Sequence, residues 1–242
     1  MNECSFTPHR GNAHAIDLPY PANPHQQPGL ARIMTLQTRA LQVPAAPEGR
    51  QTDILDAVRE AFVEKGFDGA SMQDLARAAG MSVGNFYRYF DSKDAIVEAL
   101  IRHDLTEIER DFAIIIKSEN PLATLRETLH QHVLDKRNSA DSRLWAEITA
   151  VAARKERVAK VLHQLEDDIH RYLLAVFAHV TGTNEAAVGQ RYGGHASLII
   201  LLVKASSMCS PIQPVRLAEL GDLVMRTINH TLDEIETDAA KG

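Results

Sequence analysis

Apolar residues recur at helical spacing along most of the chain from residue 50 onward. Ile54, Leu55, Val58, Ala61 and Phe62 occupy positions i, i+1, i+4, i+7 and i+8, the pattern of a helix with one buried face. Beyond residue 102 we find no convincing alternation of the kind that marks a half-buried strand. The chain is therefore predicted to be all-α. Further helices are expected over 93–117, 121–137, 141–153, 155–181, 185–208 and 215–237.

Residues 49–102 divide into short helical segments at capping residues. Gly66 is expected to end the first helix, because glycine is common just beyond a helix C-terminus. Ser71 and Asp74 have the spacing of a capping box, which predicts that a second helix begins there. Gly80 is expected to break this second helix.

Segment 72–90 has the layout of a helix-turn-helix. Two short helices that cross steeply need a small residue at their contact, and Ala76 occupies that position. Gly80 supplies the turn residue that tolerates a positive φ. Ser82 is then expected to cap a third helix that runs to Phe90. This pattern alone also occurs in helical hairpins that bind no DNA.

On a helical wheel, the third helix separates into an inner and an outer face. Phe86, Phe90 and Val83 fall on one side and are predicted to pack inward. Arg88 and Gly84 fall on the opposite side and are expected to face outward. Such a face suits DNA, because glycine lets the backbone approach closely and arginine can reach guanine O6 and N7.

Two tyrosines flank this outer face, one on each shoulder of the helix. Tyr87 and Tyr89 can pack their rings on the protein edge and aim their hydroxyls at phosphate oxygens. Asn85 lies outward and suits an adenine edge or a phosphate. Lys93 offers another phosphate site beside the free amides of the next helix. The alternative for the two tyrosines is that they extend an aromatic core.

The stretch ILDAVREAFVEKGFDGASMQDLARAAGMSVGNFYRYFDSKDAIVEAL (54–100) resembles the TetR family of transcriptional regulators. The resemblance lies in the F-x-x-K-G-F turn, the S-M-x-D-L-A second helix, A-G-M-S, and G-N-F-Y-R-Y-F-x-S-K. It implies phosphate contacts from Ser71, Tyr87, Tyr89 and Lys93. It implies base or near-base contacts from Gln73, Val83, Gly84, Asn85 and Arg88, although Val83 also has the inward alternative. Ser82 completes the predicted DNA-binding set.

The resemblance also implies an organisation and a function. It implies a three-helix DNA-binding domain (49–102) followed by a larger helical domain for effector binding and dimerisation (103–242), and the arm before them (1–48) is predicted from its composition to be disordered. The expected protein is a regulator, most often a repressor, that binds a palindromic double-stranded DNA operator as a homodimer and is released by a small molecule. An activator, or a helical DNA-binding factor without an effector, is the alternative. We find no catalytic motif, so neither an enzyme nor a cofactor is predicted.

The last two long helices are expected to form the dimer surface. Their apolar positions make two stripes that would pair with a second copy in a four-helix arrangement. The alternative is that these stripes serve only the core of the monomer. The stripe residues are Leu198, Ile199, Leu201, Leu202, Leu220, Leu223, Val224 and Ile228.

Candidate effector contacts are polar or aromatic side chains on otherwise apolar helices. A core position is the alternative for the single tryptophan, and a solvent-facing or structurally paired position is the alternative for the others. The predicted ligand-binding set is His132, Arg143, Trp145 and Tyr172, and Glu147 and His195 share the same character.

One histidine pattern has the spacing of metal ligands. His163, Asp167 and His170 fall at i, i+4 and i+7, where two imidazoles and a carboxylate share one helix face. Asp167 lies inside the charged run 166–168, so a solvated face is the better interpretation. No metal is predicted.

Charge and composition restrict the picture further. The formal net charge of −6 and the isoelectric point near 6.0 mean that any basic surface must be local. Residues 49–102 hold seven Lys and Arg against nine Asp and Glu, which predicts few neutralised phosphates and a shallow salt dependence. Cys4 and Cys209 fit a reducing compartment. No apolar run is long enough to span a bilayer, so a cytoplasmic location without a membrane partner is expected.

The first 48 residues differ from the rest of the chain in composition. They hold seven of the ten prolines and show little periodicity, which predicts disorder. Met34 is an alternative start, and residues 1–33 would then lie outside the native protein.

Overall fold

The computed structural model describes residues 48–135, 140–208 and 214–241, all within one compact unit, Val43–Gly242. Every regular element among these residues is helical, which confirms the all-α prediction. None of the described helices combines the length and the apolarity needed to cross a membrane. The predictions for the arm up to residue 47 and for Cys209 lie outside the described residues.

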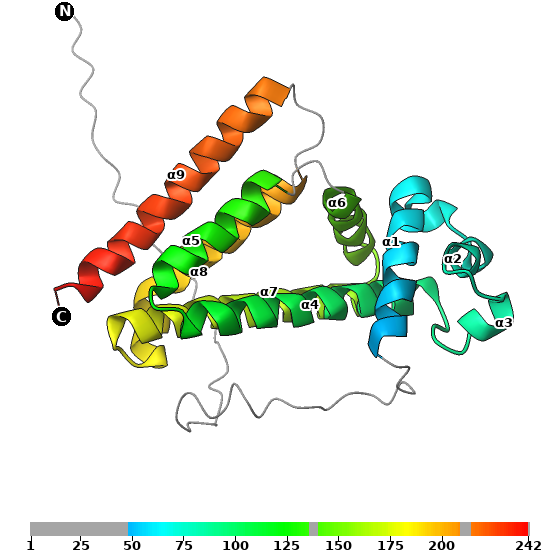
Figure 1. Ribbon diagram of the computed structural model, residues 1–242, viewed down its shortest axis with the longest axis horizontal. Coiled ribbons are helices and arrows are strands. Elements are labelled where there is room, and N and C mark those ends of the chain that lie inside the picture. Colours follow the sequence, from blue (N-terminus) through cyan, green and yellow to red (C-terminus); the bar gives the residue numbers. More distant parts are fainter. Residues whose placement is uncertain (1–47, 136–139, 209–213, 242) are drawn as a thin grey trace, which may run out of the picture. The chain divides into compact units, whose positions relative to one another are not determined.

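The helices follow one another in the order shown in Figure 1. The three elements of the predicted helix-turn-helix region come first, and a long helix then leads into the remaining bundle. The elements are α1 (Glu48–Gly69), α2 (Met72–Ala78), α3 (Val83–Phe86), α4 (Lys93–Lys117), α5 (Pro121–His130), a π-helical turn η1 (Gln131–Asp135), α6 (Ala140–Ala152), α7 (Glu156–Thr181), α8 (Glu185–Met208) and α9 (Pro214–Ala239).

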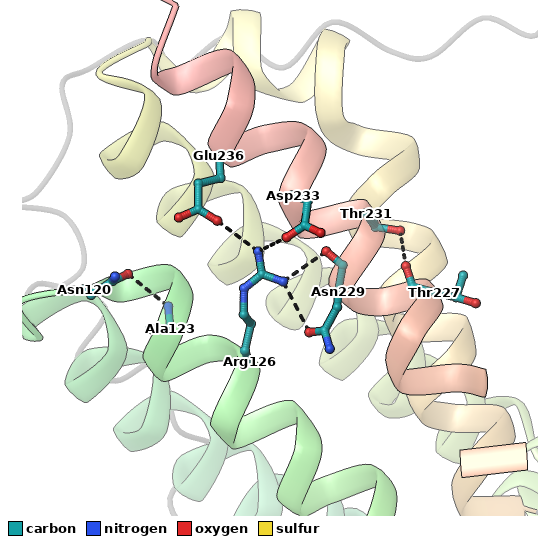
Figure 2. Close-up of polar contacts among 8 residues, drawn as sticks. All are labelled: Asn120, Ala123, Arg126, Thr227, Asn229, Thr231, Asp233 and Glu236. Carbon is teal, nitrogen blue, oxygen red and sulfur yellow. Dashed lines mark hydrogen bonds and ion pairs between the residues drawn. The ribbon is translucent and has the colours of Figure 1, made fainter. Parts of the chain in front are cut away.

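Capping residues explain where several of these helices begin. The Ser92 hydroxyl accepts a hydrogen bond from Ala95 N at 3.2 Å and so starts α4. Asn120 does the same for α5, where its Oδ1 lies 3.0 Å from Ala123 N (Figure 2). Pro121 follows in the first turn of α5, where its missing amide hydrogen costs nothing. These local signals are why the predicted helix starts lie close to the observed ones.

The helix ends predicted at residues 66 and 137 differ from the observed ones. Gly66 has a φ of 71° and interrupts α1, but the helix resumes beyond this kink and ends at Gly69. The helix expected over 121–137 ends at His130, and Gln131–Asp135 forms a π-helical turn instead. Apolar spacing marks a buried face, but it does not distinguish a bond to residue i−4 from one to residue i−5.

Among the described residues, two hydrophobic clusters form the core. The first joins the helix-turn-helix region, through Phe62, Leu75 and Phe86, to Ile148 of α6 and Val158 of α7. The second lies among α4, α5, α7, α8 and α9. Because the first cluster draws on helices from both sides of residue 102, the domain division at that residue stays a prediction.

One arginine fastens α9 to α5. Arg126 donates from one guanidinium nitrogen to the backbone oxygen of Asn229 at 3.0 Å and to its Oδ1 at 3.2 Å. Its other nitrogen donates to Asp233 at 2.6 Å and to Glu236 at 3.1 Å, as Figure 2 shows. The two carboxylates are largely exposed, so each pair contributes little energy, but together the contacts determine which face of α9 lies on α5.

Candidate functional site

The start of α2 is held by a reciprocal capping box. The Ser71 hydroxyl accepts from Asp74 N at 3.1 Å, and the Asp74 carboxylate accepts from Ser71 N at 3.1 Å, which confirms the predicted cap. Hydrogen bonds from Lys65 and from Ser71 hold the pKa of Asp74 well below its usual range. The cap therefore stays charged and intact at neutral pH, and it leaves Ser71 and Gln73 exposed at the helix end.

The turn between α2 and α3 has the geometry predicted for a helix-turn-helix. Gly80 has a φ of 63°, a conformation that residues with a side chain adopt only under strain. Met81 N donates to Ala76 O at 2.8 Å across this turn, which satisfies a carbonyl at the end of α2. Ala76 itself is fully buried, as a crossing point requires.

Residues 82–90, called the recognition segment below, contain a shorter regular helix than predicted. α3 covers only Val83–Phe86, and the bonds Arg88 N to Asn85 O (3.1 Å) and Tyr89 N to Phe86 O (3.0 Å) then span three residues. The tighter winding that such bonds produce turns the chain toward the start of α4. The predicted helix through Phe90 is corrected accordingly.

The inner and outer faces are nevertheless those of the helical wheel. Phe86 and Phe90 are 0% and 4% exposed, with ring centroids 5.4 Å apart, so both anchor the segment to the first core cluster. Arg88 and Gly84 are exposed, and a Cβ added at Gly84 would meet nothing within 4 Å. The backbone at Gly84 is therefore open to close approach by another molecule, as a DNA contact requires.

The two tyrosines are not equivalent. Tyr87 is 50% exposed and projects outward. Tyr89 is partly buried and packs on the first core cluster, with its ring 6.4 Å from that of Phe90. The core alternative thus applies in part to Tyr89, whereas Tyr87 is the free phosphate candidate. Val83 likewise packs against the first core cluster, in agreement with its inward alternative.

Lys93 has a structural task that its position in the sequence did not reveal. Its ammonium donates to Phe67 O at 2.6 Å and to Asp68 O at 3.3 Å, and lies 4.8 Å from the centre of the Phe67 ring. It therefore caps carbonyls at the end of α1 rather than standing free for a phosphate. The contact joins residues 25 and 26 positions apart, so no local pattern could have shown it.

Few positively charged side chains of the helix-turn-helix surface are free to contact a phosphate. Lys65 pairs with Asp74 at 2.7 Å, and Arg77 lies 3.7 Å from the same carboxylate. Arg88 is exposed and has no ion-pair partner among residues 48–135, 140–208 and 214–241. Of the predicted DNA-binding set, Arg88 is thus the free positive charge in the described chain.

A cavity of about 430 Å³ lies among α1, α4, α5, η1, α6, α7 and α8. His132 and Trp145 of the predicted ligand-binding set line it, and their contact with an effector stays a prediction. Arg143 is exposed on α6, and the Tyr172 ring packs against Phe112 at 5.4 Å; neither reaches the cavity wall. The apolar part of the wall includes Ile108, Phe112, Ile115, Leu125, Leu129, Leu162, Leu165, Ile169, Leu173, Ile199, Ile200, Val203 and Met208.

Charged groups occupy part of the wall. Arg59 of α1 pairs with Asp104 of α4 at 2.5 Å, and burial raises the pKa of that carboxyl although Arg59 opposes the shift. Lys204 of α8 pairs with Glu166 of α7. Sequence inspection missed the acids on α4, although Asp104, Glu107 and Asp111 share one face at i, i+3 and i+7.

The histidine pattern on α7 does not form a ligand set. His163 and Asp167 are exposed, and His170 Nε2 lies 3.1 Å from Gly193 O. In the described part of the chain, the metal-ligating atoms that converge within 4.8 Å are those of His103, Asp104 and Glu107. Asp104 is already paired with Arg59 there, so this group carries no metal assignment.

The remaining candidates have structural partners. Glu147 accepts from Phe67 N at 3.1 Å, and His195 Nε2 lies 2.9 Å from Glu234 Oε2. In the apolar stripes of α8 and α9, Ile199 and Ile228 are buried in the second core cluster, so the monomer alternative holds for them. Leu198, Leu201 and Leu223 are 38%, 61% and 51% exposed.

Comparison with known proteins identifies the family. The family model for bacterial regulatory proteins of the tetR family matches residues 54–100. The transcriptional repressor KstR2 of Rhodococcus jostii is 34% identical over 70 residues, a match that spans 29% of this chain and only 34% of that repressor. The transcriptional repressor Rv1474c of Mycobacterium tuberculosis is 32% identical over 137 residues, or 50% of this chain and 71% of that one.

The fold agrees over a longer stretch. The solved structure of Salmonella enterica GusR superposes with a TM-score of 0.60 at 24% identity and covers 79% of this chain and all of that one. The helix-turn-helix geometry, the family match and the extended similarity to Rv1474c lead to one conclusion. The chain belongs to the TetR family of bacterial transcriptional regulators.

Proposed function

We propose that this regulator is a repressor that binds a two-fold symmetric DNA operator as a homodimer and is released when a small molecule enters the cavity. The observation that carries the proposal is the outer surface of the recognition segment. It presents Tyr87, Arg88 and Gly84 to the outside while Phe86 and Phe90 hold it to the core. A protruding segment with this composition suits a major groove.

The exposed leucines support the dimer. Leu198 and Leu201 of α8 and Leu223 of α9 are large apolar side chains left on the surface of the monomer. Arg126 holds a different face of α9 on α5, which leaves the Leu223 face available. A second copy that packs on these leucines would bury them and place two recognition segments in a two-fold arrangement.

Two helices connect the cavity to the DNA-binding region. α6 places Trp145 in the cavity wall, and two residues further on Glu147 accepts a hydrogen bond from Phe67 N beside the Gly66 kink. α4 places Asp104 in the wall and begins at Lys93, which caps the end of α1. A ligand that favours a different position of α6 or α4 would shift the helix-turn-helix and weaken operator binding.

DNase footprinting on the DNA upstream of the protein's own gene tests the proposal. We expect one protected region with an inverted repeat whose half-sites lie about 34–36 Å apart or somewhat further. Two protomers or a multiple of two should occupy it in native mass spectrometry. Protection that lacks a symmetric sequence, or a complex with a single protomer, would contradict the proposal. Leu201→Glu tests the proposed dimer surface. This variant should lose both the dimer and the footprint while its circular dichroism spectrum stays helical.

A further inference from the structure

The interior of the cavity suits a molecule with a substantial apolar body. Its volume of about 430 Å³ lies within the usual range for sites that hold drug-sized molecules. The wall is mostly aliphatic, and Trp145 adds a large aromatic surface. An apolar body that fills such a space gains free energy from leaving water.

The charges in the wall are unbalanced. Among the residues that the structure describes, five carboxylates line the cavity against two permanent cations. Both cations already hold a carboxylate, since Arg59 pairs with Asp104 and Lys204 with Glu166. The excess is therefore negative. The further wall carboxylates, which have no ion pair within the described residues, are Asp56, Glu107 and Asp111.

The placement of the excess charge is as informative as its sign. Glu107 and Asp111 stand one helical turn apart on α4, on the face that carries Ile108 and Phe112 into the wall. His103 Nδ1, one turn earlier, is buried without a hydrogen-bond partner in the described structure. An anionic ligand would meet carboxylates here, whereas a cation would gain from them and from the face of an aromatic ring.

We infer that the effector is a lipophilic monocation, with its apolar body among the cavity helices and its positive centre near Glu107 and Asp111. That this ligand is an effector rests on the proposed function, but its binding to the cavity is testable without DNA. Trp145 is the only tryptophan of the chain, so tryptophan fluorescence is a local probe of the cavity wall.

The test uses three phenyl-bearing probes of different charge, of which the cation and the anion share one tetrahedral shape. Tetraphenylphosphonium is a cation, triphenylphosphine oxide is neutral and tetraphenylborate is an anion. We expect the phosphonium ion to change the Trp145 fluorescence with an affinity about ten-fold or more above that of the neutral probe, and the borate to bind weakest. Equal affinities for the three probes, or tightest binding of the borate, would overturn the inference.

Variants locate the charge effect. Glu107→Gln combined with Asp111→Asn should lower the affinity for the phosphonium ion by about ten-fold and leave that for the neutral probe unchanged. Glu109→Gln is the control, because Glu109 is exposed on the same helix and does not line the cavity. An unchanged phosphonium affinity in the double variant would also overturn the inference.

A parallel gel shift separates this inference from the proposed function. If the protein binds its operator and the borate releases it, the proposed function holds and the cationic class is wrong. If the phosphonium ion binds as expected while no DNA is bound, the cavity inference holds and the repressor proposal is wrong.

Discussion

The recognition segment and the cavity build their chemistry in opposite ways. The recognition segment takes its cap, anchors and outward groups from Ser82 to Phe90, a run of consecutive residues. Among the described residues, the cavity takes its wall from six α-helices and η1, between Asp56 and Met208. A surface made from one short segment can be inferred from local periodicity, because side-chain directions follow from the backbone. A cavity cannot, because it depends on which distant helices become neighbours.

The two regions also differ in the contacts that hold them together. Around the recognition segment, buried aromatic rings fix the position of the outward side chains. Around the cavity, ion pairs such as Arg59 with Asp104 join helices that carry no common local motif. In the proposed function, the first region is the binding surface, and the polar contacts of the second are where a ligand would change how helices pack.

The largest expected effect is the difference in stability between alanine variants of the neighbours Phe86 and Tyr87. Phe86→Ala should lower the free energy of unfolding by about 3–5 kcal/mol, because it empties a fully buried position. Tyr87→Ala should change it by less than about 0.5 kcal/mol, since that side chain is half exposed. Urea denaturation followed by circular dichroism measures both. Similar losses in the two variants would mean that the inner and outer faces are wrongly assigned.

Arg88→Ala tests the free cation of the surface. It should cost about 1–3 kcal/mol of operator binding in fluorescence anisotropy, while the dimer and the Trp145 response to cavity ligands stay unchanged. Arg110→Ala serves as the control, because Arg110 is an exposed arginine on α4 away from the recognition segment. If both variants bind the operator as the wild type does, the surface is not the DNA-binding one.

Glu147→Ala tests the connection between the two regions. Removing the acceptor for Phe67 N should reduce the coupling between cavity ligand and operator by about 0.5–2 kcal/mol and leave cavity affinity intact. Glu147→Gln keeps a side-chain oxygen that can accept this bond and should restore most of the coupling. Operator titrations with and without cavity ligand give the coupling free energy. Full coupling in the alanine variant would remove α6 from the path.

The smallest effect concerns the cap of α2. The hydrogen bond from Lys65, followed by those from Ser71, lowers the pKa of Asp74. The stability that ionised Asp74 adds to the folded state is therefore complete above the ordinary aspartate pKa of about 3.9. It is lost only as the pH falls through the depressed folded value. A carboxyl NMR titration should show Asp74 still ionised near pH 3, and Lys65→Met should move the transition upward. An ordinary titration in the wild type would contradict this account.

Several features followed from local sequence and several did not. Helices 93–117 and 185–208 were predicted at their observed limits, and the capping box at Ser71 was predicted because its partner lies three residues away. The shortened α3 was missed because a wheel assumes uniform winding. The Lys93 cap was missed because its partner carbonyls come from another helix.

The effector candidates show the same limit. Trp145 and His132 line the cavity, whereas Arg143 and Tyr172 on similar helices lie outside it, and effector contact by any of them stays a prediction. Residue type and helical spacing show that a polar group interrupts an apolar face. They do not show whether that group meets solvent, a neighbouring ring or a cavity, since only the packing of other helices decides this.

One measurement tests the link between the two regions most directly. A fluorescent operator is bound to the protein, and a cavity ligand is added while operator anisotropy and Trp145 emission are recorded together. The account predicts that operator release rises in step with the Trp145 signal and saturates at the same ligand concentration. An operator that stays fully bound after the Trp145 signal has saturated would contradict it.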